Sequence, residues 1–217
     1  MPYSVLLFDL DGTLTDPGLG ITNAVMHALT ELHIPVPPRE ELYQFIGPPL
    51  HTSFQTCYGL SREETDRAIT SFRAYYNPIG VYENTPYPGV EEFLADLKAA
   101  GYTLALATSK PQHLADQVLE MFHLTKYFTA VCGGSLDERH CAKPLIVADA
   151  LAACGVTDRA SALMIGDRKH DIEGAKANGI AAMGVLYGYG SREEFLQAGA
   201  DYICGDFEEM RRILLPK

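Results

Sequence analysis

The sequence predicts a three-layer α/β fold in which a parallel sheet is interrupted, directly after its first strand, by an all-helical module. Short apolar segments such as residues 4–8 and 102–107 are typical of strands buried on both faces of a parallel sheet. From about residue 86 such segments alternate with helical patterns, which indicates βαβ units. Between about residues 17 and 82 only helical patterns occur, which predicts the inserted module.

The composition is typical of a globular protein and argues against several kinds of partner. The 217 residues are 47% hydrophobic and carry a net charge of −11, whereas nucleic-acid-binding surfaces are basic. No apolar run approaches the ~18 residues that a membrane span needs. The five cysteines are an odd number without a C-x-x-C pair, which favours reduced thiols. We therefore expect a cytoplasmic protein that binds neither nucleic acid nor membrane.

The first expected strand, residues 4–8, is followed by Asp9 and Asp11. An i, i+2 spacing places both side chains on one side of a strand, and ligands of open α/β sheets bind at the carboxyl ends of strands. Two carboxylates ~4 Å apart repel by about 4 kcal/mol at an effective dielectric constant of ~20, so we expect a cation beside them, most naturally a divalent metal ion. Gly12 allows the chain to turn, and Thr13 offers a hydroxyl at the mouth of the strand. Asp-Gly alone would be an ordinary turn signal.

The inserted module is expected to contain four helical segments. Apolar residues recur at helical spacing from Ile21 to Leu32, shorter helices follow over residues 39–45 and up to Tyr58, and Ser61 with Glu64 forms a capping box that begins a fourth helix. We place the core domain at residues 1–15 and 84–217 and the helical cap domain at residues 16–83. The two short crossings between them are expected to act as hinges of a lid.

The rest of the chain alternates helix and strand. The periodicity predicts helices over about 90–100, 111–123, 143–154 and 172–178, after Gly190, and at the C-terminal end. Strands are expected at 102–107, 130–132, 161–165, 180–186 and, at an edge of the sheet, 201–204.

Thr108 and Ser109 end one of these strands just before Pro111, which is a favourable first residue of a helix. Their hydroxyls and the free N–H groups of the helix would suit a phosphate group. A simple helix N-cap is the alternative explanation of the two hydroxyls.

Three charged residues follow other expected strands. Lys143 begins a helix, where a cation opposes the helix dipole and a bound anion would explain its presence. A solvated surface lysine is the alternative, and Lys110 is a competing candidate for the same role. Asp167 and Asp171 follow a buried strand at i, i+4 spacing, so they face one way if a helical turn begins there. Helix capping would explain one of these two acids but not both.

Taken in order, these residues resemble the four motifs of the haloacid dehalogenase superfamily. The segment from Asp9 to Thr13 resembles its D-x-D-G-T signature, Thr108-Ser109 its second motif, Lys143 its third-motif lysine, and Gly166 to Asp171 its G-D-x-x-x-D motif. The resemblance covers the whole chain and implies a Rossmann-like core with a helical cap, as in the phosphoglycolate phosphatase-like branch. Residues 45–49 and 166–171 look like bacterial members known as 5′-nucleotidase or phosphoglycolate phosphatase, although close relatives often carry Thr-Asn at residues 108–109.

The resemblance implies a Mg²⁺-dependent phosphatase. In it Asp9 is the nucleophile that forms an aspartyl-phosphate, and Asp11 is the general acid and base. Mg²⁺ would be bound by Asp9, by Asp167 and by the backbone carbonyl of Asp11. Asp171 would orient a metal-bound water or Lys143. The groups expected to bind the phosphate are Thr13, Thr108, Ser109, Lys110 and Lys143.

The resemblance favours a nucleoside 5′-monophosphate or 2-phosphoglycolate as the substrate, and the sequence leaves the leaving group open between a nucleoside, glycolate and a sugar. Gly47, Pro48 and His51 lie in a cap turn expected to overhang the phosphate, although a lone histidine is more often structural. His170 is expected to point away from the metal. An acid at Asp11 favours a phosphatase over a dehalogenase, while a β-phosphoglucomutase-like phosphotransferase and a non-catalytic phosphate-binding regulator remain alternatives. We expect a monomer or a weak homodimer acting on a small phosphate ester.

Overall fold

The computed structural model describes residues 3–215 and contains a six-stranded sheet in which every neighbouring pair is parallel. The strand order is β5-β4-β1-β6-β7-β8. The strands are β1 (Val5–Phe8), β4 (Thr103–Pro111), β5 (Ala130–Gly134), β6 (Ala162–Gly166), β7 (Ala181–Val185) and β8 (Tyr202–Cys204). Val5 is in register with Thr103 on one side and with Ala162 on the other, so β1 lies centrally. The expected parallel α/β sheet and its β8 edge are confirmed.

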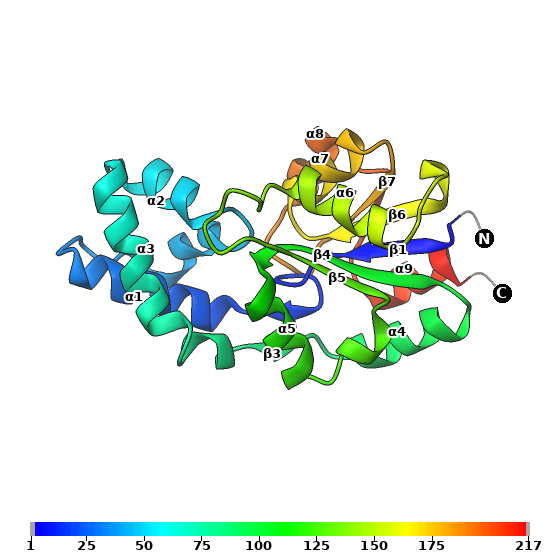
Figure 1. Ribbon diagram of the computed structural model, residues 1–217, viewed down its shortest axis with the longest axis horizontal. Helices are drawn as coiled ribbons and strands as arrows, with labels where there is room; N and C mark the ends of the chain where they lie inside the picture. The colour runs from blue at the N-terminus through cyan, green and yellow to red at the C-terminus, as the bar shows by residue number, and fades with distance from the viewer. Residues whose placement is uncertain (1–2, 216–217) are drawn as a thin grey trace.

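Helices cover both faces of this sheet (Figure 1). One face carries α4 (Val90–Ala99), α5 (Gln112–Met121) and α9 (Phe207–Leu214), and the other carries α6 (Lys143–Ala153), α7 (Lys169–Ala177) and α8 (Arg192–Ala198). Because strand side chains alternate between faces, Leu6 and Phe8 join one apolar core while Val5 and Leu7 join the other. This is why β1 is apolar at every position.

The inserted module lies beyond the carboxyl end of β1 (Figure 1). It comprises α1 (Gly18–Glu31), η1 (Arg39–Phe45), α2 (Leu50–Tyr58), α3 (Arg62–Tyr76) and η2 (Gly80–Tyr82). The capping box is present, because Glu64 N donates to Ser61 Oγ at 3.3 Å and Ser61 N donates to Glu64 Oε2 at 2.9 Å. The segment Arg39–Phe45 is a 3₁₀ helix, and two further 3₁₀ turns lie at Thr125–Tyr127 and Arg159–Ser161.

The two crossings between core and cap pair with each other. β2 (Thr15–Asp16) and β3 (Thr85–Pro86) form an antiparallel ribbon, in which Thr15 is opposite Pro86. The sequence analysis did not predict these strands, since two residues are too few to show a period. The ribbon lies where we expected the hinges.

Two expected boundaries are wrong in ways that affect the site. β4 continues to Pro111, which pairs with Gly134 across a register shift, and α5 begins only at Gln112. Thr108 and Ser109 therefore lie inside a strand and do not cap a helix. In addition, α7 begins at Lys169, so Asp171 lies in its first turn. No helix among the described residues has the length and apolar character needed to cross a membrane.

Candidate active site

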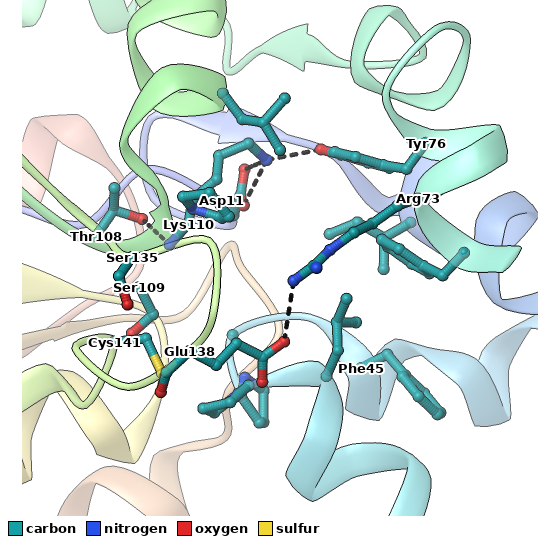
Figure 2. A pocket seen from close by; sticks show the side chains of 18 of the residues that line it. Asp11, Phe45, Arg73, Tyr76, Thr108, Ser109, Lys110, Ser135, Glu138 and Cys141 are labelled. Atoms are coloured by element: carbon teal, nitrogen blue, oxygen red, sulfur yellow. Dashed lines mark hydrogen bonds and ion pairs between the residues drawn. The ribbon is translucent and has the colours of Figure 1, made fainter. Parts of the chain in front are cut away.

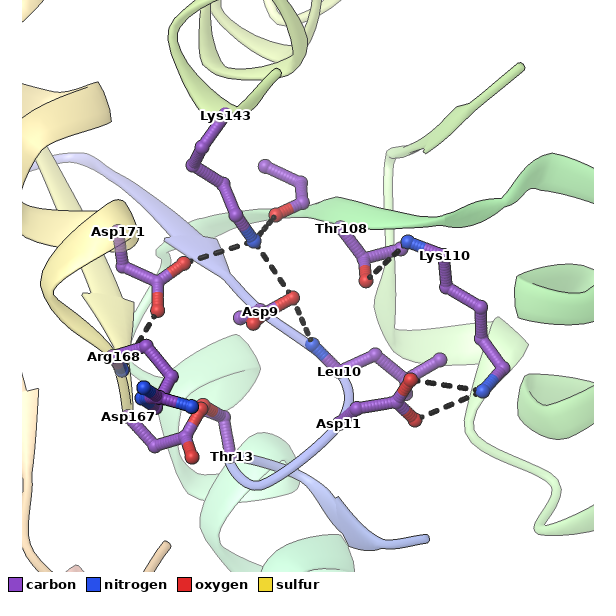
Figure 3. A network of polar contacts seen from close by, with 11 residues as sticks. Asp9, Leu10, Asp11, Thr13, Thr108, Lys110, Lys143, Asp167, Arg168 and Asp171 are labelled. Atoms are coloured by element: carbon purple, nitrogen blue, oxygen red, sulfur yellow. Dashed lines mark hydrogen bonds and ion pairs between the residues drawn. The ribbon is translucent and has the colours of Figure 1, made fainter. Parts of the chain in front are cut away.

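The carboxylates of Asp9 and Asp11 contact different lysines, although an i, i+2 spacing on a strand would place them side by side. β1 ends at Phe8, and the chain then turns so that Thr13 N and Leu14 N both donate to Leu10 O. As Figure 3 shows, each carboxylate consequently has its own lysine, Asp9 with Lys143 and Asp11 with Lys110.

Lys143 is the first residue of α6 and is 5% exposed. Its Nζ lies 2.9 Å from Asp9 Oδ1 and 2.8 Å from Asp171 Oδ1, and it donates to Ala107 O at 3.1 Å. Burial opposes the charge, yet the carboxylates of Asp171 and Asp9 raise the pKa of Lys143 above its usual value. These two carboxylates explain a cation at the helix N-terminus, which the sequence analysis had attributed to a bound anion.

Asp167 and Asp171 complete an acidic cluster. One carboxylate oxygen each of Asp9, Asp167 and Asp171 lie within 4.8 Å of one another. Asp167 accepts from Tyr189 N at 2.8 Å and from the Thr13 hydroxyl at 3.4 Å. Burial, followed by the charges of Asp171 and Asp9, raises the pKa of Asp167 well above its usual value, and burial raises the pKa of Asp171 to about 6 despite Lys143.

Two glycines make this close approach possible. A Cβ atom at Gly12, whose φ is +82°, would overlap the carboxylate of Asp167, and one at Gly166 would overlap the carboxylate of Asp171. Any other residue at either position would therefore push an acid away from the cluster.

The charges of the site favour a divalent cation. When ionised, the four carboxylates of Asp9, Asp11, Asp167 and Asp171 face two ammonium groups, which leaves two negative charges uncompensated. Buried charges are strongly unfavourable unless they are paired. Clustered carboxylate oxygens are the donors that a hard ion such as Mg²⁺ takes, so the residues fit a metal ion.

A cavity of about 100 Å³ lies between the carboxyl ends of β1 and β4 and the cap (Figure 2). Of the expected site residues, those that line it are Asp9, Asp11, Gly47, Pro48, Thr108, Ser109 and Lys110. The Thr108 hydroxyl accepts from Lys110 N at 3.3 Å. The sequence analysis missed Arg73, Tyr76 and Glu138, because side chains on a cap helix and on a core loop carry no local signal of meeting at a cavity.

The other expected site residues do not line this cavity: Lys143, Asp167 and Asp171 lie in the cluster with Asp9, and Thr13 and His51 lie elsewhere. The Thr13 hydroxyl is fully buried and donates to Asp167, so it supports the acidic cluster. His51 Nε2 lies 3.4 Å from Asp66 Oδ1 within the cap, which agrees with a structural histidine. His170 Nδ1 lies 3.5 Å from Glu173 Oε2, one turn along α7.

Comparison with known proteins places this chain in a family. A family model described as haloacid dehalogenase-like hydrolase matches residues 6–185. The chain belongs to that family. A relative named 5′-nucleotidase, from Pseudomonas aeruginosa, is 39% identical over 98% of this chain and 96% of its own. A phosphoglycolate phosphatase from Vibrio parahaemolyticus is 29% identical over 97% of this chain and 95% of its own.

Two solved structures are similar to this chain over nearly its whole length. A crystal structure of a "predicted phosphatase" from Clostridium acetobutylicum is 40% identical and superimposes with a TM-score of 0.95 over all of both chains. The structure of protein tyrosine kinase A from Mycobacterium tuberculosis is 34% identical, with a TM-score of 0.85 over 98% of both chains. This chain is therefore a phosphatase-type enzyme of the family, with one relative named for transfer of phosphate to tyrosine.

Proposed function

We propose that this enzyme is a Mg²⁺-dependent phosphomonoesterase in which Asp9 is transiently phosphorylated. The observation that carries the proposal is the convergence of Asp9, Asp167 and Asp171 with Lys143 beside a cavity that Asp9 and Asp11 line. A carboxylate can form a covalent acyl-phosphate intermediate. Release of the alcohol also requires a proton donor. Both kinds of group are present at one place.

The contacts of Asp9 suggest which oxygen attacks. Lys143 Nζ and Leu10 N both contact Oδ1, at 2.9 Å and 2.8 Å. We therefore assign Oδ2 as the nucleophile: it bonds to phosphorus as the bond to the leaving alcohol oxygen breaks. Asp11 gives its proton to that oxygen. Asp11 then takes a proton from water, whose oxygen attacks phosphorus, so that phosphate leaves and Asp9 is restored.

The remaining residues have holding roles in the proposal. Asp9, Asp167 and the backbone carbonyl of Asp11 would hold Mg²⁺, which when bound neutralises charge on the transferred phosphoryl group. Asp171 positions Lys143, at 2.8 Å. Thr108, Ser109 and Lys143 are assigned to the phosphoryl oxygens. Lys110 is assigned to Asp11, because its ammonium group lies 2.8 Å from that carboxylate.

The cavity lining favours an uncharged leaving group. Its walls include Ile21, Phe45 and Phe72, and the carboxylate of Glu138 lies among them. The carboxylate of 2-phosphoglycolate would meet Glu138, while Arg73, the nearby cation, already contacts Leu136 O at 2.6 Å and Glu138 Oε1 at 3.7 Å. We therefore favour a nucleoside 5′-monophosphate.

Phosphate release from a panel of monoesters tests the proposal. The panel contains nucleoside 5′-monophosphates, 2-phosphoglycolate, hexose phosphates and p-nitrophenyl phosphate, each with Mg²⁺ and with EDTA. We expect nucleotides to be turned over best, Mg²⁺ to be required, and Asp9→Asn to be inactive. Turnover that needs a sugar bisphosphate would instead identify a mutase, and phosphate transfer without release would identify a kinase. Full activity of Asp9→Asn would refute the mechanism.

A further inference from the structure

A cap residue reaches into the core and contacts the group that holds Asp11. Tyr76, the last residue of α3, has its hydroxyl 2.6 Å from Lys110 Nζ, and the same Nζ lies 2.8 Å and 3.1 Å from the two carboxylate oxygens of Asp11. Figure 2 shows the three side chains in a row, with Tyr76 entering from the cap. Tyr76, Lys110 and Asp11 are 3%, 8% and 9% exposed, so these contacts are shielded from bulk solvent.

The position of the Lys110 ammonium group depends on both partners. An ammonium group has three protons to donate, and a buried one without acceptors is strongly disfavoured. Asp11 and the Tyr76 hydroxyl provide these acceptors, and the Tyr76 ring centre lies 5.0 Å from Nζ. Without the hydroxyl, one proton of Lys110 loses its buried acceptor, and the ammonium group gains by moving toward the cavity and away from Asp11.

The Tyr76 ring is itself held in place. It stacks on Phe72, one turn earlier in α3, with ring centres 5.3 Å apart. On its other side, a Cβ at Gly80 would lie 2.9 Å from Tyr76 Cδ2, so the backbone of η2 packs closely against the ring. The hydroxyl therefore moves with the cap as a rigid extension of α3.

We propose that Tyr76 is a positioning residue through which closure of the cap sets Lys110 and, through Lys110, the Asp11 carboxyl for proton transfer to the leaving group. The inference rests on the proposed function, since it assigns a role to its general acid. Tyr76 belongs to the cap, whereas Asp11 follows β1 and Lys110 lies in β4 of the core, so the contact requires a closed cap. An open cap would leave Asp11 without its fixed orientation, and proton transfer would be restricted to a closed, substrate-filled site.

The leaving group provides a selective test. An alkoxide must be protonated as it departs, whereas p-nitrophenolate leaves without a proton. The readout is the single-turnover rate of leaving-group release, because the later hydrolysis of the aspartyl-phosphate also uses Asp11 and is common to both esters. For Tyr76→Phe we expect this rate on a nucleoside 5′-monophosphate to fall by roughly tenfold or more, a part of the 10²–10⁴-fold that general acids contribute. We expect the rate on p-nitrophenyl phosphate to stay within about twofold, because release of p-nitrophenolate needs no proton donation. KM should change little for either ester.

The matched control is Tyr75→Phe. It removes a hydroxyl from the preceding residue of α3, which is bound to Glu83 at 3.1 Å near the end of the cap. This variant should leave the ratio of the two single-turnover rates at the wild-type level. Lys110→Met should show the same selective loss as Tyr76→Phe. The double variant should show no further loss, because both changes disturb the orientation of the same Asp11 carboxyl.

Several results would overturn the inference. Equal losses in the two single-turnover rates would show that Tyr76 or Lys110 serves phosphate binding, cap closure or stability in general. Wild-type rates on both esters in Tyr76→Phe would show that the hydroxyl is dispensable. If Tyr76→Phe lowers Tm markedly, the selective loss must still appear in Lys110→Met, and its absence there refutes the proposal. Failure of the wild-type enzyme to hydrolyse either ester with Mg²⁺ would refute the proposed function, and this inference with it.

Discussion

The ammonium group of Lys143 lies 2.9 Å from Asp9 Oδ1, and both side chains are buried, with 4% and 5% exposed. The same ammonium group lies 2.8 Å from Asp171 Oδ1. One cation thus separates two carboxylates at the point where α6 begins, and it faces the residue that we propose as the nucleophile.

Lys143→Met is expected to abolish turnover and to destabilise the fold. The variant leaves Asp9 and Asp171 facing each other without a cation, and breaking a buried ion pair costs about 3–5 kcal/mol. Urea denaturation in EDTA measures the change in the free energy of unfolding. Lys126→Met is the control, because Lys126 and Glu91 form an exposed pair with 58% and 51% of their side chains accessible. Its effect on the free energy of unfolding should be much smaller, because solvent screens an exposed pair. Similar effects of the two variants would contradict a structural role of the Lys143 pair.

Asp167→Asn should remove the stabilisation that Mg²⁺ gives. A ligand at about 100 times its Kd stabilises the folded state by about 2.7 kcal/mol, and this appears as a rise in Tm. Asp167 is fully buried within the carboxylate cluster, so its loss removes a proposed ligand atom. Differential scanning calorimetry with and without Mg²⁺ measures the shift. Asp137→Asn, an exposed aspartate of the core, should keep the shift. A wild-type shift in Asp167→Asn would mean that the ion binds elsewhere.

Stability of the metal-free protein should show a pH-dependent contribution from Asp171. Its folded-state pKa is raised from the usual 3.8 to about 6, chiefly by burial. Because the folded state binds the proton more tightly, this contribution is fully present below about pH 4 and is lost as pH rises through about 6, at about 1.4 kcal/mol per pKa unit. Asp171→Asn cannot titrate, so its stability relative to wild type should rise between pH 4 and 7. Parallel pH profiles in EDTA would show that Asp171 carries no such shift.

Glu138 joins the core to the cap near the cavity. Its Oε2 accepts from His51 N at 3.1 Å, and its Oε1 lies 3.7 Å from Arg73 Nη2. If losing these contacts destabilises the closed state by about 1 kcal/mol, the fraction of enzyme in the binding-competent closed state falls roughly fivefold. The apparent affinity for substrate falls by the same factor. Glu138→Ala should therefore raise KM by roughly this factor and speed hydrogen exchange at residues 135–140. Arg139→Ala, whose side chain is 88% exposed and lies 3.4 Å from Asp137, is the control in the same loop. An unchanged KM in Glu138→Ala would show that this contact does not govern closure.

The parts of the fold that sequence patterns predicted are those with local causes. An apolar strand such as β1 indicates burial on both faces because each face carries every second side chain. The Ser61–Glu64 capping box satisfies its own helix end within four residues. In the same way, the order of the strands' polar ends indicated that Asp9, Lys143 and Asp167 would lie at one edge of the sheet, as they do.

Structural features that depend on residues far apart in the sequence left no local sequence pattern. The β2–β3 ribbon joins segments of two residues each, too short for any period to appear. Thr108 was expected at a helix start, but pairing of Pro111 with Gly134 extends β4 past it. Asp9 and Asp11 were expected side by side, yet the turn after Phe8 directs them to different lysines.

Local residue order was thus enough to establish the sheet, the insertion of the cap and the acidic residues that gather at the strand ends. Folding in three dimensions established which lysine serves which acid, and brought Tyr76, Arg73 and Glu138 to one cavity. The physical reason is range: hydrophobic periodicity and capping act over one or two turns of chain. The contact of Tyr76 with Lys110 joins residues 34 positions apart, so no local pattern could indicate it.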